Sequence, residues 1–189
     1  MFKHVLIPTD GSPTANRAVK AGIKFAHEIG AKVTGYHAIE DLYKGDILFE
    51  GSAIDPKTRA KFERSAREAA QNRLDAIGKL ARAAGVAFDS AVTVVNTPYK
   101  GIIDVARKRR CDVIFMASHG RRGVSGLLMG SVTQKVLTHC TIPVLVYRGA
   151  ASGHRYSCRR FATGDGRLGT PQSARAEHRP RRIPPDSCL

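Results

Sequence analysis

The chain lacks several features that would place it in a familiar class. It has no apolar run of about 18 residues or more, the length that a transmembrane helix needs. Its four cysteines, at 111, 140, 158 and 188, form no Cys-x-x-Cys pair, which argues against a zinc site or a disulfide framework. Cys111 and Cys140 are instead predicted to fill the core or helix ends. No charged segment with a cleavage site precedes the first strand pattern, so we expect a cytoplasmic protein without a secretory signal.

Acidic residues are scarce relative to basic ones. Sixteen Asp and Glu stand against 31 Lys and Arg, for a formal net charge of +15. Eight of the cations are interspersed with three acids in the polar segment 56–84, which we interpret as a solvated helix face; the cations are Lys57, Arg59, Lys61, Arg64, Arg67, Arg73, Lys79 and Arg82. No RNA-recognition signature, helix-turn-helix pattern or basic sheet interleaved with aromatics accompanies this charge. We therefore expect no nucleic-acid binding except through a basic tail.

That tail is residues 149–189. It contains eight arginines and no lysine, is rich in Gly, Ser and Pro, and has no apolar periodicity. Such a composition buries too little apolar surface to offset its ordering entropy, so the sequence predicts a disordered segment. One hypothesis is out-of-frame readthrough of a GC-rich gene, because GC-rich codons give arginine without lysine. The alternative is an evolved basic tail that binds nucleic acid or acidic partners.

Residues 1–148 alternate between strand and helix patterns. The predicted strands are 3–8, 32–39, 86–95, 112–117 and 143–148, and the predicted helices are 13–29, 56–84, 98–109 and 130–139. Ser12-Pro13 and Thr97-Pro98 are typical helix starts, and Gly85 is a typical helix end. Strands separated by helices predict an α/β fold: an open five-stranded, mainly parallel sheet with helices on both faces, of the Rossmann-like type.

A glycine-rich segment from Met116 to Thr133 follows one of the apolar strand patterns. We expect its glycines, at 120, 123, 126 and 130, to adopt positive φ and let the backbone approach an anion. Ser131 and the first free amides of the next helix would donate to that anion, aided by the helix dipole. Arg121 and Arg122 could clamp outer phosphates or lie solvated at the surface. The alternative interpretation is a flexible surface loop.

Asp10 stands just beyond the carboxyl end of the first strand pattern. In open α/β sheets, ligands bind outside the carboxyl ends of the strands, where the strand order reverses. An acidic side chain there can hydrogen-bond ribose hydroxyls while the glycine-rich loop holds phosphates. The alternative for Asp10 is a turn or capping role.

Together these motifs resemble the universal stress protein family. The resemblance is carried by Val-Leu-Ile-Pro-Thr-Asp-Gly-Ser at 5–12, by Ser-His-Gly-Arg-Arg-Gly at 118–123 leading to Gly130-Ser131-Val132-Thr133, and by Pro143-Val-Leu-Val-Tyr147. It covers residues 1–148. It implies an adenine nucleotide α-hydrolase-like fold and a homodimer in which the edge strand, Ile142 to Tyr147, meets its copy.

In the nucleotide-binding branch, the resemblance implies bound ATP with a divalent cation, Mg or Mn, on the phosphates; no dedicated metal site is expected. The residues that would contact the nucleoside are Pro8, Thr9, Asp10, Ala38, Met116 and Ala117. Those that would hold the triphosphate are Gly120, Gly130, Ser131, Val132 and Thr133. That branch has glycine where this chain has Ala117. Alanine fits there if its φ is negative and is strained if φ is positive.

The predicted function is an ATP-binding regulator of a stress response that acts as a homodimer. Nucleotide occupancy would order residues 117–130 and change dimer or partner contacts. One alternative is a dimeric scaffold that binds no nucleotide, for which Ala117 is the sequence argument. Another is a slow ATPase, although the chain has no Walker-type Gly-Lys-Ser/Thr and no nucleophile with a recognisable base. No catalytic residue is predicted, and His119 is interpreted as structural or solvent-facing.

Overall fold

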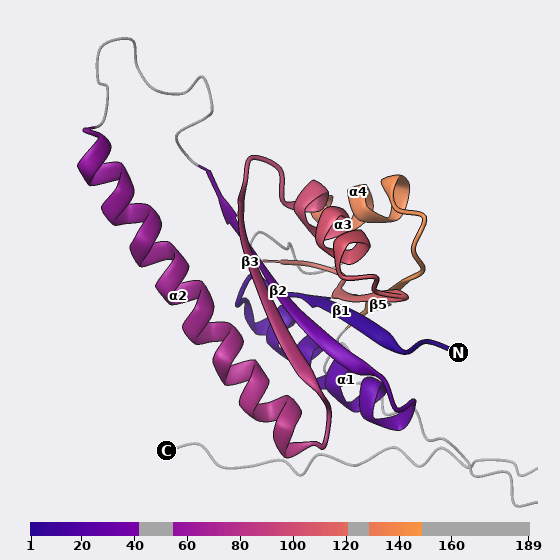
Figure 1. Ribbon diagram of the computed structural model, residues 1–189. Coiled ribbons are helices and arrows are strands. Elements are labelled where there is room, and N and C mark those ends of the chain that lie inside the picture. The colour runs from indigo at the N-terminus through magenta and orange to yellow at the C-terminus, as the bar shows by residue number, and fades with distance from the viewer. Residues whose placement is uncertain (42–54, 121–128, 149–189) are drawn as a thin grey trace, which may run out of the picture. The chain divides into compact units, whose positions relative to one another are not determined.

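The computed structural model describes residues 1–41, 55–120 and 129–148. Its strands are β1 (His4–Pro8), β2 (Lys32–Glu40), β3 (Phe88–Val95), β4 (Val113–Ala117) and β5 (Val144–Tyr147). Its helices are α1 (Pro13–Glu28), α2 (Pro56–Ala83), α3 (Pro98–Lys108) and α4 (Ser131–His139), as Figure 1 shows. Every predicted element is present. None of the helices described has both the length and the apolar character that crossing a membrane requires.

The five strands form one sheet in the order β3-β2-β1-β4-β5. All of its strand pairs are parallel, so the predicted α/β fold is confirmed. From β1 the chain moves outward to β2 and β3, then returns to place β4 on the other side of β1. The strand order therefore reverses between β1 and β4. At such a point the two following loops diverge, which leaves a crevice at the carboxyl edge of the sheet.

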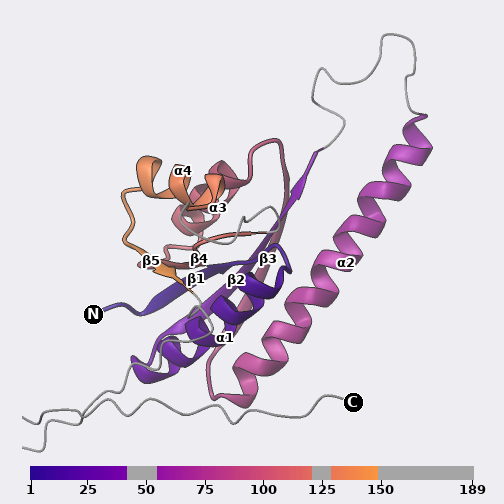
Figure 2. The same cartoon turned by 180° about the vertical axis from the view of Figure 1, so that it is seen from behind.

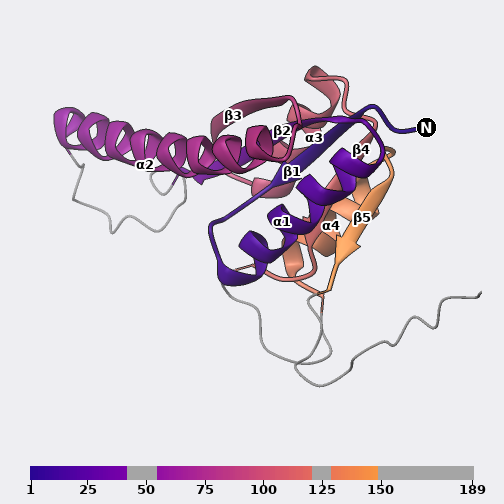
Figure 3. The same cartoon turned by 90° about the horizontal axis from the view of Figure 1, so that it is seen from below.

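The strands bury side chains on both faces of the sheet. On one face, Val5, Ile7 and Val113 pack against the apolar stripes of α1 and α2. On the other face, Leu6 and Ile114 pack against α3 and α4. This two-sided burial explains why the central strands β1 and β4 are almost continuously apolar rather than alternating. Figure 2 and Figure 3 show the same division, with α1 and α2 on one side of the sheet and α3 and α4 on the other.

The helix ends follow the predicted signals with one exception. The Ser12 hydroxyl accepts a hydrogen bond from the Ala15 amide at 3.1 Å and caps α1, as predicted. Gly85, with a φ of +73°, follows the end of α2. Thr97 was predicted to cap α3, but its side chain makes no capping hydrogen bond. The amides of Lys100 and Gly101 bond the Thr97 backbone carbonyl instead, at 3.1 and 3.3 Å.

Candidate functional site

Hydrogen bonds between side chains and backbone amides of the same segment stabilise the turn after β1. The Asp10 carboxylate accepts from the Ser12 amide at 2.9 Å, and the Thr9 hydroxyl accepts from the Gly11 amide at 3.1 Å. Gly11 has a φ of +79°, a conformation that side chains rarely adopt. The turn therefore holds Asp10 at the carboxyl end of β1. It satisfies the turn role that was the alternative for Asp10 and, at the same time, presents the second carboxylate oxygen to the crevice.

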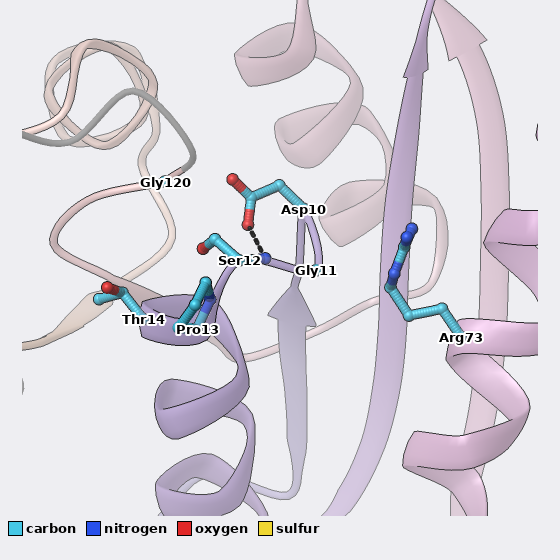
Figure 4. A pocket seen from close by; sticks show the side chains of 7 residues that line it. All are labelled: Asp10, Gly11, Ser12, Pro13, Thr14, Arg73 and Gly120. Atoms are coloured by element: carbon cyan, nitrogen blue, oxygen red, sulfur yellow. Dashed lines mark hydrogen bonds between the residues drawn. The ribbon is translucent and has the colours of Figure 1, made fainter.

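That second oxygen faces the loop after β4. A Cβ placed on Gly120 would lie 2.6 Å from Asp10 Oδ2, so only glycine leaves room for the carboxylate. Figure 4 shows the Asp10 carboxylate turned toward Gly120. The prediction that Gly120 and Gly130 adopt positive φ was wrong, since the positive-φ glycines of the described chain are Gly11, Gly30 and Gly85. Gly120 and Gly130 allow a close approach of neighbouring atoms rather than an unusual backbone geometry, and Gly123 and Gly126 lie outside the described residues.

Gly130 joins the start of α4 to the same loop. Its amide donates to the Ser118 carbonyl at 2.8 Å, and a Cβ on it would lie 3.2 Å from that carbonyl oxygen. Gly130 is the N-cap residue and provides no side-chain cap, unlike Ser12 at α1. The first intrahelical hydrogen bond is that of the Gln134 amide to the Gly130 carbonyl. The amides of the three preceding residues, 131–133, are therefore suited to donate hydrogen bonds to an anion.

The position where the chain departs from the family motif is unstrained. Ala117 is the last residue of β4 and is buried; the one non-glycine residue with positive φ in the described chain is Arg110. The Ala117 carbonyl accepts a hydrogen bond from the buried Thr133 hydroxyl at 2.9 Å. That hydrogen bond connects α4 to β4 and uses the hydroxyl of Thr133. The backbone amide is then the donor of Thr133 that is suited to bind a ligand.

The crevice contains a cleft of about 480 Å³. It is lined by Asp10, Gly11, Ser12, Pro13, Thr14, Arg73 and Gly120 (Figure 4). Asp10 and Gly120 were predicted site residues, but the others were not. Arg73 was interpreted as part of a solvated helix face, and that interpretation was wrong: its half-buried side chain reaches from α2 into the cleft. The sequence gives no signal for this, because only the packing of α2 on the sheet brings residues 10 and 73 together.

A histidine that the sequence did not single out connects Arg73 to β1. The buried His37 ring lies with Nδ1 2.7 Å from the Thr9 carbonyl oxygen and Nε2 3.4 Å from Arg73 Nη1. A carbonyl oxygen only accepts and a guanidinium only donates. This pattern requires a neutral imidazole with its proton on Nδ1. His37 therefore positions the Arg73 guanidinium over the turn after β1.

His119, Cys111 and Cys140 are all at least partly buried. His119 Nδ1 lies 3.0 Å from the Ser118 hydroxyl, a partner that the sequence did not reveal. Its buried Nε2 has no hydrogen-bond partner among the residues that the structure describes. Cys111 is buried in the apolar cluster under α3 and α4, and Cys140 ends α4. Burial raises the pKa of the Cys111 thiol to about 11, so it stays protonated and unreactive near neutral pH.

The remaining predicted residues lie on several different elements. Pro8 and Thr9 end β1 beside Asp10, while Ala38 and Met116 share the apolar cluster on the α3 and α4 face. Val132 packs against that same cluster, and Ser131 is exposed at the start of α4. Arg121 and Arg122 lie outside the described residues. In the described ranges, no three His, Cys, Asp or Glu side chains gather to hold a metal ion.

Comparison with known proteins agrees with this architecture. The model of the universal stress protein family matches residues 1–148. The chain belongs to the universal stress protein family. Among curated members, it is 33% identical to a Methanocaldococcus jannaschii universal stress protein, MJ0577, over 78% of this chain and 96% of the relative. It is 30% identical to one from Thermus aquaticus, over 78% of this chain and the relative's full length.

Solved universal stress protein structures share the fold. The structure of MJ0577 has a TM-score of 0.68 at 28% identity and covers 80% of this chain and 99% of that protein. A universal stress protein from Lactobacillus plantarum has a TM-score of 0.65 at 18% identity, over 78% of this chain and 98% of its own length. Another, with a TM-score of 0.52 at 21% identity over 77% and 96% of the two chains, was solved with cAMP.

Proposed function

We propose that this universal stress protein binds an adenine nucleotide, ATP with a divalent cation, in the crevice between β1 and β4 and acts as a cytoplasmic, nucleotide-dependent regulator of a stress response. One observation carries the proposal: Asp10 Oδ2 lies beside Gly120 at the strand-order reversal, next to a helix N-terminus without a side-chain cap. A carboxylate suits ribose hydroxyls, and uncapped amides suit phosphates. That a universal stress protein of the same fold was solved with cAMP favours an adenine nucleotide.

The residues present fit such a ligand. The Asp10 carboxylate would accept from ribose hydroxyls, and the amides of Ser131, Val132 and Thr133 would donate to the phosphates. Pro8, Thr9, Ala38, Met116 and Ala117 would surround the nucleoside, and Gly120 and Gly130 would leave room for the chain of phosphates. A cation would neutralise the phosphates, and since no three-residue metal cluster exists in the described part of the chain, it would enter with the nucleotide. Arg121 and Arg122 remain proposed phosphate contacts.

The negative φ of Ala117 argues against the scaffold alternative, because alanine imposes no strain at this point. This geometry supports nucleotide binding despite the departure from the family motif. Ligand occupancy would shift the population of conformers around the loop after β4 and so alter partner contacts.

The test is calorimetric titration of the purified protein with ATP and Mg²⁺, preceded by analysis of nucleotide released on denaturation. We expect ATP or another adenine nucleotide near one per protomer, and a rise in melting temperature with added ligand. Asp10→Ala should abolish that rise. Asp75→Ala is the matched control, because Asp75 is an exposed carboxylate of α2 bonded to Gln71. An absence of bound nucleotide, with no heat at millimolar ATP, would support the scaffold alternative.

The proposed assembly is a homodimer through β5. This strand lies at the edge of the sheet, and Leu145 at its centre is 37% exposed. An apolar edge strand favours pairing with another chain. Leu145→Glu should therefore convert the dimer to monomer in sedimentation analysis. Leu137→Glu, at a similarly exposed leucine on α4, should leave the dimer intact; equal sedimentation of both variants would contradict this interface.

A further inference from the structure

Arg73 is a cation in the cleft whose donors are largely unused. A guanidinium carries five N–H donors. In the described chain, its one hydrogen bond is the 3.4 Å contact with His37, and no carboxylate lies within ion-pair distance of it. The donors that remain are available to the cleft. A fixed planar fork of this kind suits phosphate oxygens, which it can bind through two parallel hydrogen bonds.

The position of Arg73 indicates that it does not bind the phosphates that the N-terminus of α4 would hold. In the sheet, β1 lies between β2 and β4. Arg73 contacts His37 on β2 and lies against Gly11, whereas Gly120 and the start of α4 follow β4. Asp10 stands between these two groups, as Figure 4 shows. Phosphates at Gly120 and α4 would therefore lie on the opposite side of Asp10 from Arg73.

The Asp10 carboxylate is directed away from Arg73. One of its oxygens accepts from the Ser12 amide, and the other faces Gly120. Figure 4 shows the guanidinium on the other side of the turn, separated from the carboxylate by Gly11. A second anionic group could thus approach Arg73 without meeting the carboxylate oxygens directly.

We propose that Arg73 is a specificity-determining residue that binds a phosphate on the 2′ or 3′ hydroxyl of the ribose. The inference rests on the proposed function, which places the ribose at Asp10. Arg73 then selects adenine nucleotides that carry a ribose phosphate in addition to the 5′ phosphate. His37 acts as a positioning residue, because its Nε2 accepts from the guanidinium while Nδ1 is fixed by the Thr9 carbonyl.

The experiment compares three ligands that share one nucleoside. They are 5′-AMP, adenosine 2′,5′-bisphosphate and adenosine 3′,5′-bisphosphate, titrated calorimetrically into the full-length protein. We expect one of the bisphosphates to bind about tenfold or more tightly than 5′-AMP. Arg73→Gln should remove that preference, because it should weaken bisphosphate binding by about tenfold or more and 5′-AMP binding much less. Arg73→Lys should keep part of it, since lysine keeps the charge without the planar fork.

The control is Arg82→Gln, an exposed arginine nine positions further along α2, which should leave all three affinities unchanged. Melting temperatures establish that each variant is folded. An equal loss for all three ligands in Arg73→Gln would place Arg73 at the 5′ phosphate or the base and overturn the inference. Equal binding of the three ligands by the unmodified protein would also overturn it. If 5′-AMP and ATP bind in that case, the proposed function stands alone; if no nucleotide binds, both proposals fail.

Discussion

At the scale of single residues, the site depends on glycines that leave space as much as on the side chains that line it. Gly120 and Gly130 leave space for the Asp10 carboxylate and the Ser118 carbonyl, and neither needs a special φ for this. Asp10 combines a local turn with an oxygen directed across the crevice. The sequence indicated these residues through their motif, but the steric reason for each glycine came from the neighbour it meets in space.

Gly120→Ala should weaken adenine nucleotide binding about tenfold or more, measured by calorimetry. The added Cβ would lie 2.6 Å from Asp10 Oδ2, so the carboxylate must leave its position. Because Gly120 is exposed, the free energy of unfolding should change by less than about 0.5 kcal/mol. Unchanged affinity in this variant would show that Asp10 does not need its observed position to bind the ligand.

His4 should make stability depend on pH. Burial first, and then the nearby Lys32 cation, hold the pKa of His4 below its usual value of 6.5. The unfolded chain therefore binds the proton more readily than the folded one. The stabilisation is complete above about pH 6.5 and is lost as pH falls from there through the folded-state pKa.

Urea unfolding between about pH 7.5 and 5 measures this effect, and His4→Gln should flatten the decline in unfolding free energy. His27→Gln replaces an exposed histidine of α1 and should retain the decline of the unmodified protein. A slope that His4→Gln leaves unchanged would assign the pH dependence to other groups.

At the scale of elements, the position of the site depends on how closely α1 approaches the sheet. Gly22 on α1 faces Ile7 on β1 and Phe115 on β4, the two strands that border the crevice. This contact sets how far the N-terminus of α1, and the turn that carries Asp10, lie from the sheet. Gly22 lies on the buried face of α1. Periodicity can identify such a face in a sequence, but it does not indicate that the face needs a residue without a side chain.

Gly22→Ala should destabilise the fold by about 1–3 kcal/mol, although alanine is the better helix former. Its Cβ would lie 2.7 Å from Ile7 Cδ1 and 3.0 Å from Phe115 Cδ1, inside a packed core. Chemical denaturation measures the change in unfolding free energy, with one slope of free energy against denaturant concentration used for both proteins. Lys20→Ala, on the exposed side of α1, should stay within about 0.5 kcal/mol of the unmodified protein. A neutral Gly22→Ala would mean that α1 can shift outward without cost.

At the scale of the whole molecule, both apolar clusters lie within residues 1–148, the range that the family model matches. Residues 149–189 lie outside the described chain. The two hypotheses for them, readthrough or an evolved basic tail, remain predictions from composition.

Deletion of residues 149–189 should leave the melting temperature and nucleotide affinity unchanged, because the core and the candidate site lie in the remaining chain. Calorimetry and thermal unfolding measure both quantities. Binding to duplex DNA at two salt concentrations, with and without the deletion, separates the hypotheses. Salt-dependent binding that disappears with the tail would contradict the readthrough hypothesis.

The sequence by itself determined the order of strands and helices along the chain and the turn after β1. These features depend on the periodicity of nearby residues and on local capping, which a linear pattern records. Only the tertiary structure decided that Arg73 lies beside the turn after β1 and that His37 fixes it there. Residues 10, 37 and 73 are far apart in the chain, and no local pattern encodes their contact. Packing of the face of α2 that carries Ala70, Leu74 and Ile77 brings them together, because Arg73 borders this buried face.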